Sequence, residues 1–152
     1  MSDDADPIAI TDEIKELVNN ALVGGYPMLL AAVDGEGKPR LSFRGSIQTF
    51  SADQLGFWAR NGEGETMEAI AVNPNVAAML RKPESRAFLQ FTGRARVVSG
   101  AERDKVYDSA PEFERRADAE KKGVGIVIDL DRVEGGWPGA DGQRGRVRMA
   151  RR

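Results

Sequence analysis

The sequence predicts a mainly β protein, a small antiparallel barrel with peripheral helices. Six short apolar or alternating segments follow one another along the chain, turn residues separate them, and only a few stretches show helical periodicity. The length of 152 residues fits one domain. The balance of 41% apolar and 30% charged residues is that of an ordinary soluble protein with a real core.

The first 10 residues are expected to form a flexible acidic lead-in. Thr11 is a suitable N-cap for a helix, because its hydroxyl can accept a hydrogen bond from a free N–H of the first turn. This helix should end at Gly24-Gly25. Its apolar residues recur at helical spacing and should be buried: Ile14, Leu17, Val18, Ala21 and Leu22.

Alternation predicts the strands that follow. An apolar strand at 28–33 is joined by a hairpin-type turn to a long alternating strand at 40–49. In that long strand the core-facing residues are expected to be Leu41, Phe43, Gly45, Ile47 and Thr49. The opposite, polar face would hold Arg40, Ser42, Arg44, Ser46 and Gln48. The remaining strands are expected at 55–60, 75–81, 87–98 and 123–133.

Two further helical stretches interrupt the strands. A short helix at 66–72 should stop at Asn73-Pro74. A charged helical insert at 101–121 should break at Pro111. Its expected apolar anchors are Val106, Tyr107 and Phe113. Residues 135–152 are expected to be a loop and an Arg-rich C-terminal tail, with five arginines among the last nine residues.

Composition excludes several classes of function. With no cysteine and no histidine, the chain has no disulfide framework, no thiolate nucleophile, no Cys/His metal site and no Ser-His-Asp triad. A net charge of −2 disfavours nucleic-acid partners. The absence of a long apolar run and the acidic start indicate a cytoplasmic protein with no membrane contact. An enzyme of this composition would rely on carboxylates, Lys or Tyr, or on a bound cofactor. No metal is expected.

Two polar rows are candidate binding sites. On the long strand, Arg44, Ser46 and Gln48 place a guanidinium, a hydroxyl and an amide on one face, and Gly45 permits close approach of a ligand. This chemistry suits an anion. The alternative is the polar outer face of a half-exposed strand. A second row on 87–98 is open to the same two interpretations: Gln90, Thr92, Arg94 and Arg96.

Four segments carry a resemblance to a known family. They are RGSIQTF (44–50), LGFWARN (55–61), AIAVNPNVAAMLR (69–81) and FTGRARVV (91–98). In this order and spacing they resemble the pyridoxamine 5'-phosphate oxidase-like FMN-binding split-barrel family, over residues 11–134. The resemblance implies a six-stranded antiparallel split β-barrel that forms a homodimer, with flavin mononucleotide (FMN) in a groove between the two barrels.

The resemblance also implies which residues bind the cofactor. Arg44 and Ser46 would meet the phosphate and the ring edge. The next strand would line the groove with Trp58, Ala59 and Arg60. The phosphate would also meet Glu65, Thr66 and Met67. From the facing subunit, Gln90 and Thr92 would approach the cofactor.

The implied function is an FMN-dependent oxidoreductase that transfers hydride to or from an unidentified small molecule. Its catalytic residues stay unassigned. Thr66 stands where many members of the family carry a phosphate-binding Lys or Arg, and Glu63 and Glu65 lie beside it. This departure leaves three alternatives open. They are a reductase on the same fold that uses the deazaflavin F420, a non-catalytic flavin-binding or storage module, and a groove without a cofactor.

Overall fold

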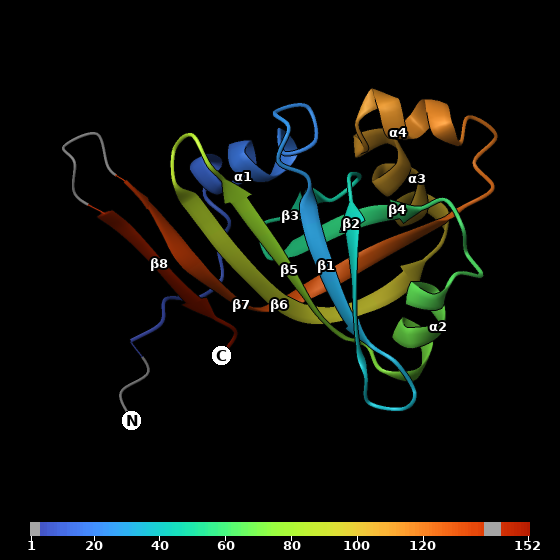
Figure 1. Cartoon of the computed structure of the whole chain (residues 1–152), viewed down its shortest axis with the longest axis horizontal. Coiled ribbons are helices and arrows are strands. Elements are labelled where there is room, and N and C mark those ends of the chain that lie inside the picture. The colour runs from blue at the N-terminus through green and yellow to red at the C-terminus, as the bar shows by residue number, and fades with distance from the viewer. Residues whose placement is uncertain (1–3, 139–143) are drawn as a thin grey trace.

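The computed structural model describes residues 4–138 and 144–152. Within these residues the chain forms eight strands and four helices (Figure 1). The strands are β1 (Met28–Val33), β2 (Pro39–Arg44), β3 (Gln48–Ser51), β4 (Gln54–Ala59), β5 (Asn75–Lys82), β6 (Ala87–Val98), β7 (Val124–Pro138) and β8 (Arg144–Ala150). The helices are α1 (Asp12–Asn19), α2 (Glu65–Val72), α3 (Gly100–Ser109) and α4 (Glu112–Ala117).

All strands belong to one antiparallel sheet that closes as a split barrel. The strand order is β2-β1-β5-β6-β7-β4-β3, and β8 pairs with β7 outside this path. Although β2 and β3 are consecutive in the chain, they lie at opposite ends of the order, so the connection at 45–47 must cross from one edge of the sheet to the other. Ser46 fixes this crossing, because its Oγ donates to the Trp58 carbonyl and accepts from the Trp58 N–H, each at 2.9 Å.

The core fills the inside of the barrel, and α1 covers part of it. Large side chains from five strands are fully buried there: Met28, Leu30, Phe57, Leu80, Leu89, Phe91, Ile126 and Ile128. As predicted, Thr11 caps α1, accepting a hydrogen bond from the Ile14 N–H at 3.2 Å. The helix ends at Asn19, earlier than predicted, and turns carry the chain on to Gly25. Ile14 and Val18 bury the inner face of α1 in the core.

The insert that contains α3 and α4 packs on the outside of β4 and β7. Val106 and Tyr107 are buried there against Trp58, which confirms two of the three predicted anchors. Phe113 is 70% exposed, so the prediction for this residue was wrong. Its neighbour Glu114 is the α4 residue that turns inward.

The predicted fold class is confirmed, but the strand count is eight rather than six. The long strand predicted at 40–49 is in fact β2 and β3, separated by the crossing at 45–47. Its predicted faces were also wrong for β2. Leu41 and Phe43 are 72% and 68% exposed. Directly opposed residues of an antiparallel pair share a face, and Arg44 and Ser42 pair with the buried Met28 and Leu30. The polar row of β2 therefore faces inward.

The described residues near the two ends of the chain pair with each other, where a loop and a tail were expected at 135–152. β7 continues to Pro138, and β8 pairs along it. The lead-in joins the same sheet through a bridge between Asp6 and Met149, and Ala5 is buried. Residues 1–3 of the lead-in and 139–143 of the loop lie outside the described residues. The pairing follows from alternation in β8, where Val147 and Met149 pack on the core and the arginines beside them, Arg146 and Arg148, are exposed.

Candidate functional site

A groove runs along the inward face of β2, and we define it by two adjoining cavities that share Arg44 and Asn61. The α2 cavity, of about 350 Å³, lies between β2 and the start of α2 and is lined by Arg40, Leu41, Ser42, Arg44, Asn61, Gly64, Glu65, Thr66 and Met67. The α4 cavity, of about 280 Å³, lies beside α4 and is lined by Phe43, Arg44, Gly45, Ser46, Trp58, Arg60, Asn61 and Glu114.

The α2 cavity combines a helix start with a positive charge. Gly64 is the N-cap of α2 and has no side chain to bond the N–H groups of the first turn. The positive end of the helix dipole therefore faces the cavity without a capping side chain. Arg40 lies at its mouth, with Nη1 at 2.8 Å from Glu65 Oε2 and Nε at 3.3 Å from Asp34 Oδ2. The arrangement suits an anionic group that can compete with Glu65 for Arg40.

Arg44 connects the two cavities and is partly desolvated. Its Nε donates to Ser42 Oγ at 3.1 Å, and its Cζ lies 5.7 Å from the centre of the Phe57 ring. Burial lowers the pKa of Arg44, Glu114 opposes this shift, and nearby Arg60 adds to it. A guanidinium remains charged at neutral pH despite such a shift. Arg44 thus offers a charged donor that is only partly solvated to any acceptor in the groove.

The α4 cavity contains a buried carboxylate. Glu114 is only 8% exposed, and its Oε2 lies 3.7 Å from Arg60 Nε, which is an ion-pair contact longer than a hydrogen bond. Its other oxygen abuts the backbone of Gly45. A Cβ added at Gly45 would lie 2.7 Å from Glu114 Oε1 and 3.0 Å from Leu22 Cδ1. The glycine therefore leaves the space that the carboxylate occupies.

Most of the residues predicted to bind the cofactor do line this groove. They are Arg44, Gly45, Ser46, Trp58, Arg60, Glu65, Thr66 and Met67. Four predicted residues lie elsewhere. Ala59 is fully buried in the core. Gln48 lines a separate cavity beside α1, with Nε2 at 3.5 Å from the Asn19 carbonyl oxygen. Gln90 and Thr92 lie on β6, where they pair with Met79 and Ala77 of β5.

Ser46 and Trp58 use their polar groups for hydrogen bonds within the protein. Ser46 bonds the backbone of Trp58 on both sides, as described above. Trp58 Nε1 donates to Asp118 Oδ2 at 2.8 Å, and the Trp58 ring packs edge to face on Tyr107 at 5.0 Å. Burial raises the pKa of Asp118, but hydrogen bonds from Trp58 and from backbone N–H groups outweigh it and hold the pKa below its usual range. Ser46 and Trp58 therefore shape the wall of the groove.

Sequence reasoning missed four polar side chains that line the groove: Arg40, Ser42, Asn61 and Glu114. Arg40 and Ser42 alternate with Arg44, so the spacing that singled out Arg44 could have found them. Glu114 has no comparable signal. It reaches the groove only because the insert brings α4 beside Gly45 and Arg60, which is a tertiary event.

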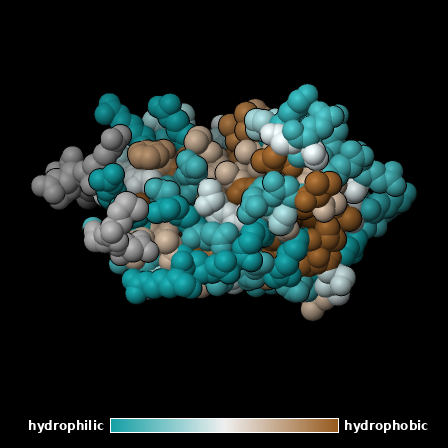
Figure 2. All heavy atoms as spheres, turned by 90° about the horizontal axis from the view of Figure 1, so that it is seen from below, coloured by the Kyte–Doolittle hydropathy of each residue, from teal (hydrophilic) through white to brown (hydrophobic). Residues whose placement is uncertain are grey.

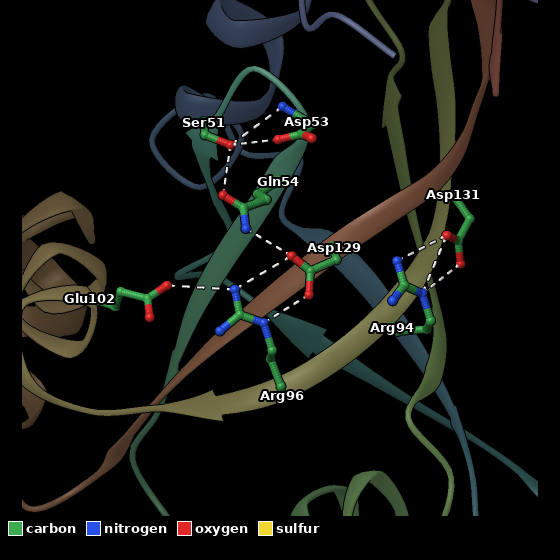
Figure 3. A network of polar contacts seen from close by, with 8 residues as sticks. All are labelled: Ser51, Asp53, Gln54, Arg94, Arg96, Glu102, Asp129 and Asp131. Atoms are coloured by element: carbon green, nitrogen blue, oxygen red, sulfur yellow. Dashed lines mark hydrogen bonds and ion pairs between the residues drawn. The ribbon is translucent and has the colours of Figure 1, made fainter. Parts of the chain in front are cut away.

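The second polar row, on β6, is neutralised by acidic neighbours from β7 and α3 (Figure 3). Arg94 makes a forked contact with Asp131, at 3.1–3.3 Å. Arg96 bonds Asp129 at 2.8 Å and also pairs with Glu102 at 3.5 Å. Of the two interpretations given above, these contacts favour a structural ion-pair network over an anion site.

The described residues contain no helix long and apolar enough to span a membrane. The same residues contain no cluster of three or more acidic groups placed to hold a metal ion.

The fold and the groove define an antiparallel split barrel with a polar site at its open edge. The chain belongs to the pyridoxamine 5'-phosphate oxidase family, whose profile matches residues 10–134. This match confirms the resemblance seen in the sequence. No curated protein matches the chain.

Solved structures share the fold. HupZ of Group A Streptococcus is 25% identical with a TM-score of 0.65, and the alignment covers 83% of this chain and 93% of HupZ. An FMN-binding protein from Syntrophomonas wolfei is 11% identical with a TM-score of 0.64, covering 81% and 86% of the two chains. A protein described as F420 reductase is 23% identical with a TM-score of 0.56, covering 75% and 94%.

Proposed function

We propose that this protein binds FMN in the groove and acts as an oxidoreductase on a small molecule. The observation that carries the proposal is the inward row of Arg40, Ser42 and Arg44, which faces the uncapped start of α2. A phosphate is the group that such a pair of helix start and arginine suits best. When bound, FMN supplies hydride transfer, which explains how an enzyme can work without cysteine or histidine.

The residues present fit the two ends of this cofactor. In the α2 cavity, the first-turn N–H groups of α2, the Thr66 hydroxyl and Arg40 would hold the phosphate. Trp58 supplies apolar surface to the α4 cavity, where a flat ring needs it. Arg44 stands between the two cavities and offers positive charge to the ring edge.

We also propose that the protein works as a homodimer, joined through the outer face of β2, β1 and β5. Leu41 and Phe43 are exposed there and Met79 is 49% exposed, all on strands that lie side by side. Hydrophobic residues gather over the half of the molecule that carries β1, β2 and α2 (Figure 2). Phe91 on β6 is buried in the core and takes no part in this surface. Gln90 and Thr92 adjoin the surface, so a partner docked there would meet them.

A second candidate is an F420-dependent reductase. The observation in its favour is the first turn of α2, which carries Glu65 and Thr66 and no basic side chain. A fold neighbour described as F420 reductase is consistent with this alternative.

The test is titration of the purified protein with FMN and with F420, followed by visible absorbance and fluorescence. Saturable FMN binding that Arg44→Ala weakens and Arg116→Ala leaves unchanged would support the proposal, since Arg116 lies on the outer surface of α4. Binding of F420 without binding of FMN would support the second candidate, the F420-dependent reductase. Tight FMN binding without turnover by any reductant or substrate would indicate a storage module, and no binding of either would refute both.

A further inference from the structure

The carboxylate of Glu114 lines the α4 cavity and has no role in the proposed binding of the phosphate. Glu114 is 8% exposed as a residue, and its ion-pair contact to Arg60 is 3.7 Å long. A buried carboxylate normally has well-formed hydrogen bonds, because leaving it without them is unfavourable. Gly45 makes room for it, because a Cβ there would lie 2.7 Å from Glu114 Oε1 and the carboxylate would have to shift. Glu114 therefore has acceptor capacity that a ligand in the cavity can use.

The neighbours of Glu114 complete a pattern of hydrogen-bonding groups. Arg44 and Arg60 both line the same cavity, and both lie close enough to interact electrostatically. A carboxylate only accepts hydrogen bonds and a guanidinium only donates them. The cavity thus presents donor, acceptor and donor groups from β2, α4 and the end of β4.

Simple ions do not satisfy this pattern. A cation would pair with Glu114 but would meet two arginines. An anion would pair with the arginines but would meet a buried carboxylate. Either ligand leaves a desolvated charge poorly paired, which is unfavourable. A neutral edge that presents an acceptor, a donor and an acceptor in a row satisfies all three side chains.

We propose that the α4 cavity recognises an imide edge, the C=O, N–H, C=O sequence of a pyrimidinedione ring, with Glu114 accepting from its N–H. This inference rests on the proposed function and refines it, because flavins and deazaflavins share this edge. It assigns the pyrimidinedione end of the ring to the α4 cavity and the phosphate end to the α2 cavity. It also gives the α3–α4 insert a role, which is to bring a carboxylate to the open edge of the barrel.

The test compares FMN with 3-methyl-FMN, in which a methyl group replaces the hydrogen of the imide N–H. Dissociation constants are measured by quenching of flavin fluorescence on the full chain. The wild-type protein should bind 3-methyl-FMN roughly tenfold or more weakly than FMN, the effect of losing a hydrogen bond to a charged group. Glu114→Ala should bind the two flavins equally, and Glu114→Gln, which keeps a neutral acceptor, should show a preference smaller than that of the wild type.

Glu112→Ala is the matched control, because Glu112 lies on the same helix, exposed and paired with Arg116 at 2.6 Å. It should keep the wild-type preference. Wild-type protein that binds FMN and 3-methyl-FMN equally well overturns the inference and leaves the proposed function standing. A wild-type preference that survives unchanged in Glu114→Ala overturns the assignment to Glu114. Absence of saturable FMN binding overturns the proposed function and the inference together.

Discussion

Ser46→Ala should destabilise the protein substantially, although it removes a single oxygen atom. In an antiparallel strand, the N–H and C=O of one residue point to the same side. In Trp58 both groups point away from β7, and both bond the Ser46 hydroxyl, at 2.9 Å each. The site is buried, so water cannot easily replace the hydroxyl. Each backbone group left unpaired costs about 1–3 kcal/mol, so the two groups together give an expected loss of about 2–6 kcal/mol. In a domain of this size the melting temperature should fall by roughly 4–24 °C.

Urea denaturation and thermal melting followed by circular dichroism would measure this loss. Ser99→Ala is the matched control, since the Ser99 side chain makes no capping hydrogen bond to α3. It should stay within about 0.5 kcal/mol of the wild type. If Ser46→Ala is as stable as the control, the hydroxyl does not hold the crossing between β2 and β3, and the explanation of how the barrel closes is wrong.

Three further outcomes are expected. Gly93→Ala should lower the free energy of unfolding in urea by about 3 kcal/mol, because its Cβ would lie 2.3 Å from the Asp129 carbonyl oxygen at the β6 irregularity. Gly35→Ala is the control, since its Cβ would meet nothing closer than 3.8 Å, and equal stabilities of the two variants would contradict the prediction. Burial raises the pKa of Asp129, but bonds from Arg96 and Gln54 hold it below the ordinary 3.8. Ionised Asp129 therefore stabilises the fold above pH 3.8. The difference in unfolding free energy between the wild type and Asp129→Asn should shrink as the pH falls below this value, and a difference that does not change with pH would contradict the role of these hydrogen bonds. Phe43→Asp should shift the light-scattering mass from dimer to monomer, and a dimer that persists would exclude the β2 face as the interface.

The strands and their order along the chain could be predicted because alternation and turn residues are local signals. The structure reproduces the predicted bounds of β1 and β6, and the break of the insert at Pro111. The pairing of β8 with β7 could not be predicted, since an Arg-rich segment becomes a strand only when another strand supplies hydrogen bonds and an apolar floor for Val147 and Met149.

The candidate site shows the same limit more sharply. The sequence determined by itself that polar and apolar residues alternate along 40–44, and that Arg44 lies in the polar row. It did not determine which row faces the inside, because alternation has the same period whichever face is buried. Pairing with β1 decided that question, by placing Arg44 and Ser42 on the same side as Met28 and Leu30.

Glu114 and Ser46 mark the boundary between what is local and what is tertiary. Composition alone established that any chemistry here proceeds without cysteine or histidine, because residue types are independent of folding. The meeting of Glu114 with Gly45, and of Ser46 with Trp58, joins segments that are distant in the chain. Such contacts depend on barrel closure and on the packing of the α3–α4 insert against the barrel, and no local pattern encodes them. The sequence thus determined the chemical groups available, and the tertiary structure decided which of them share a cavity.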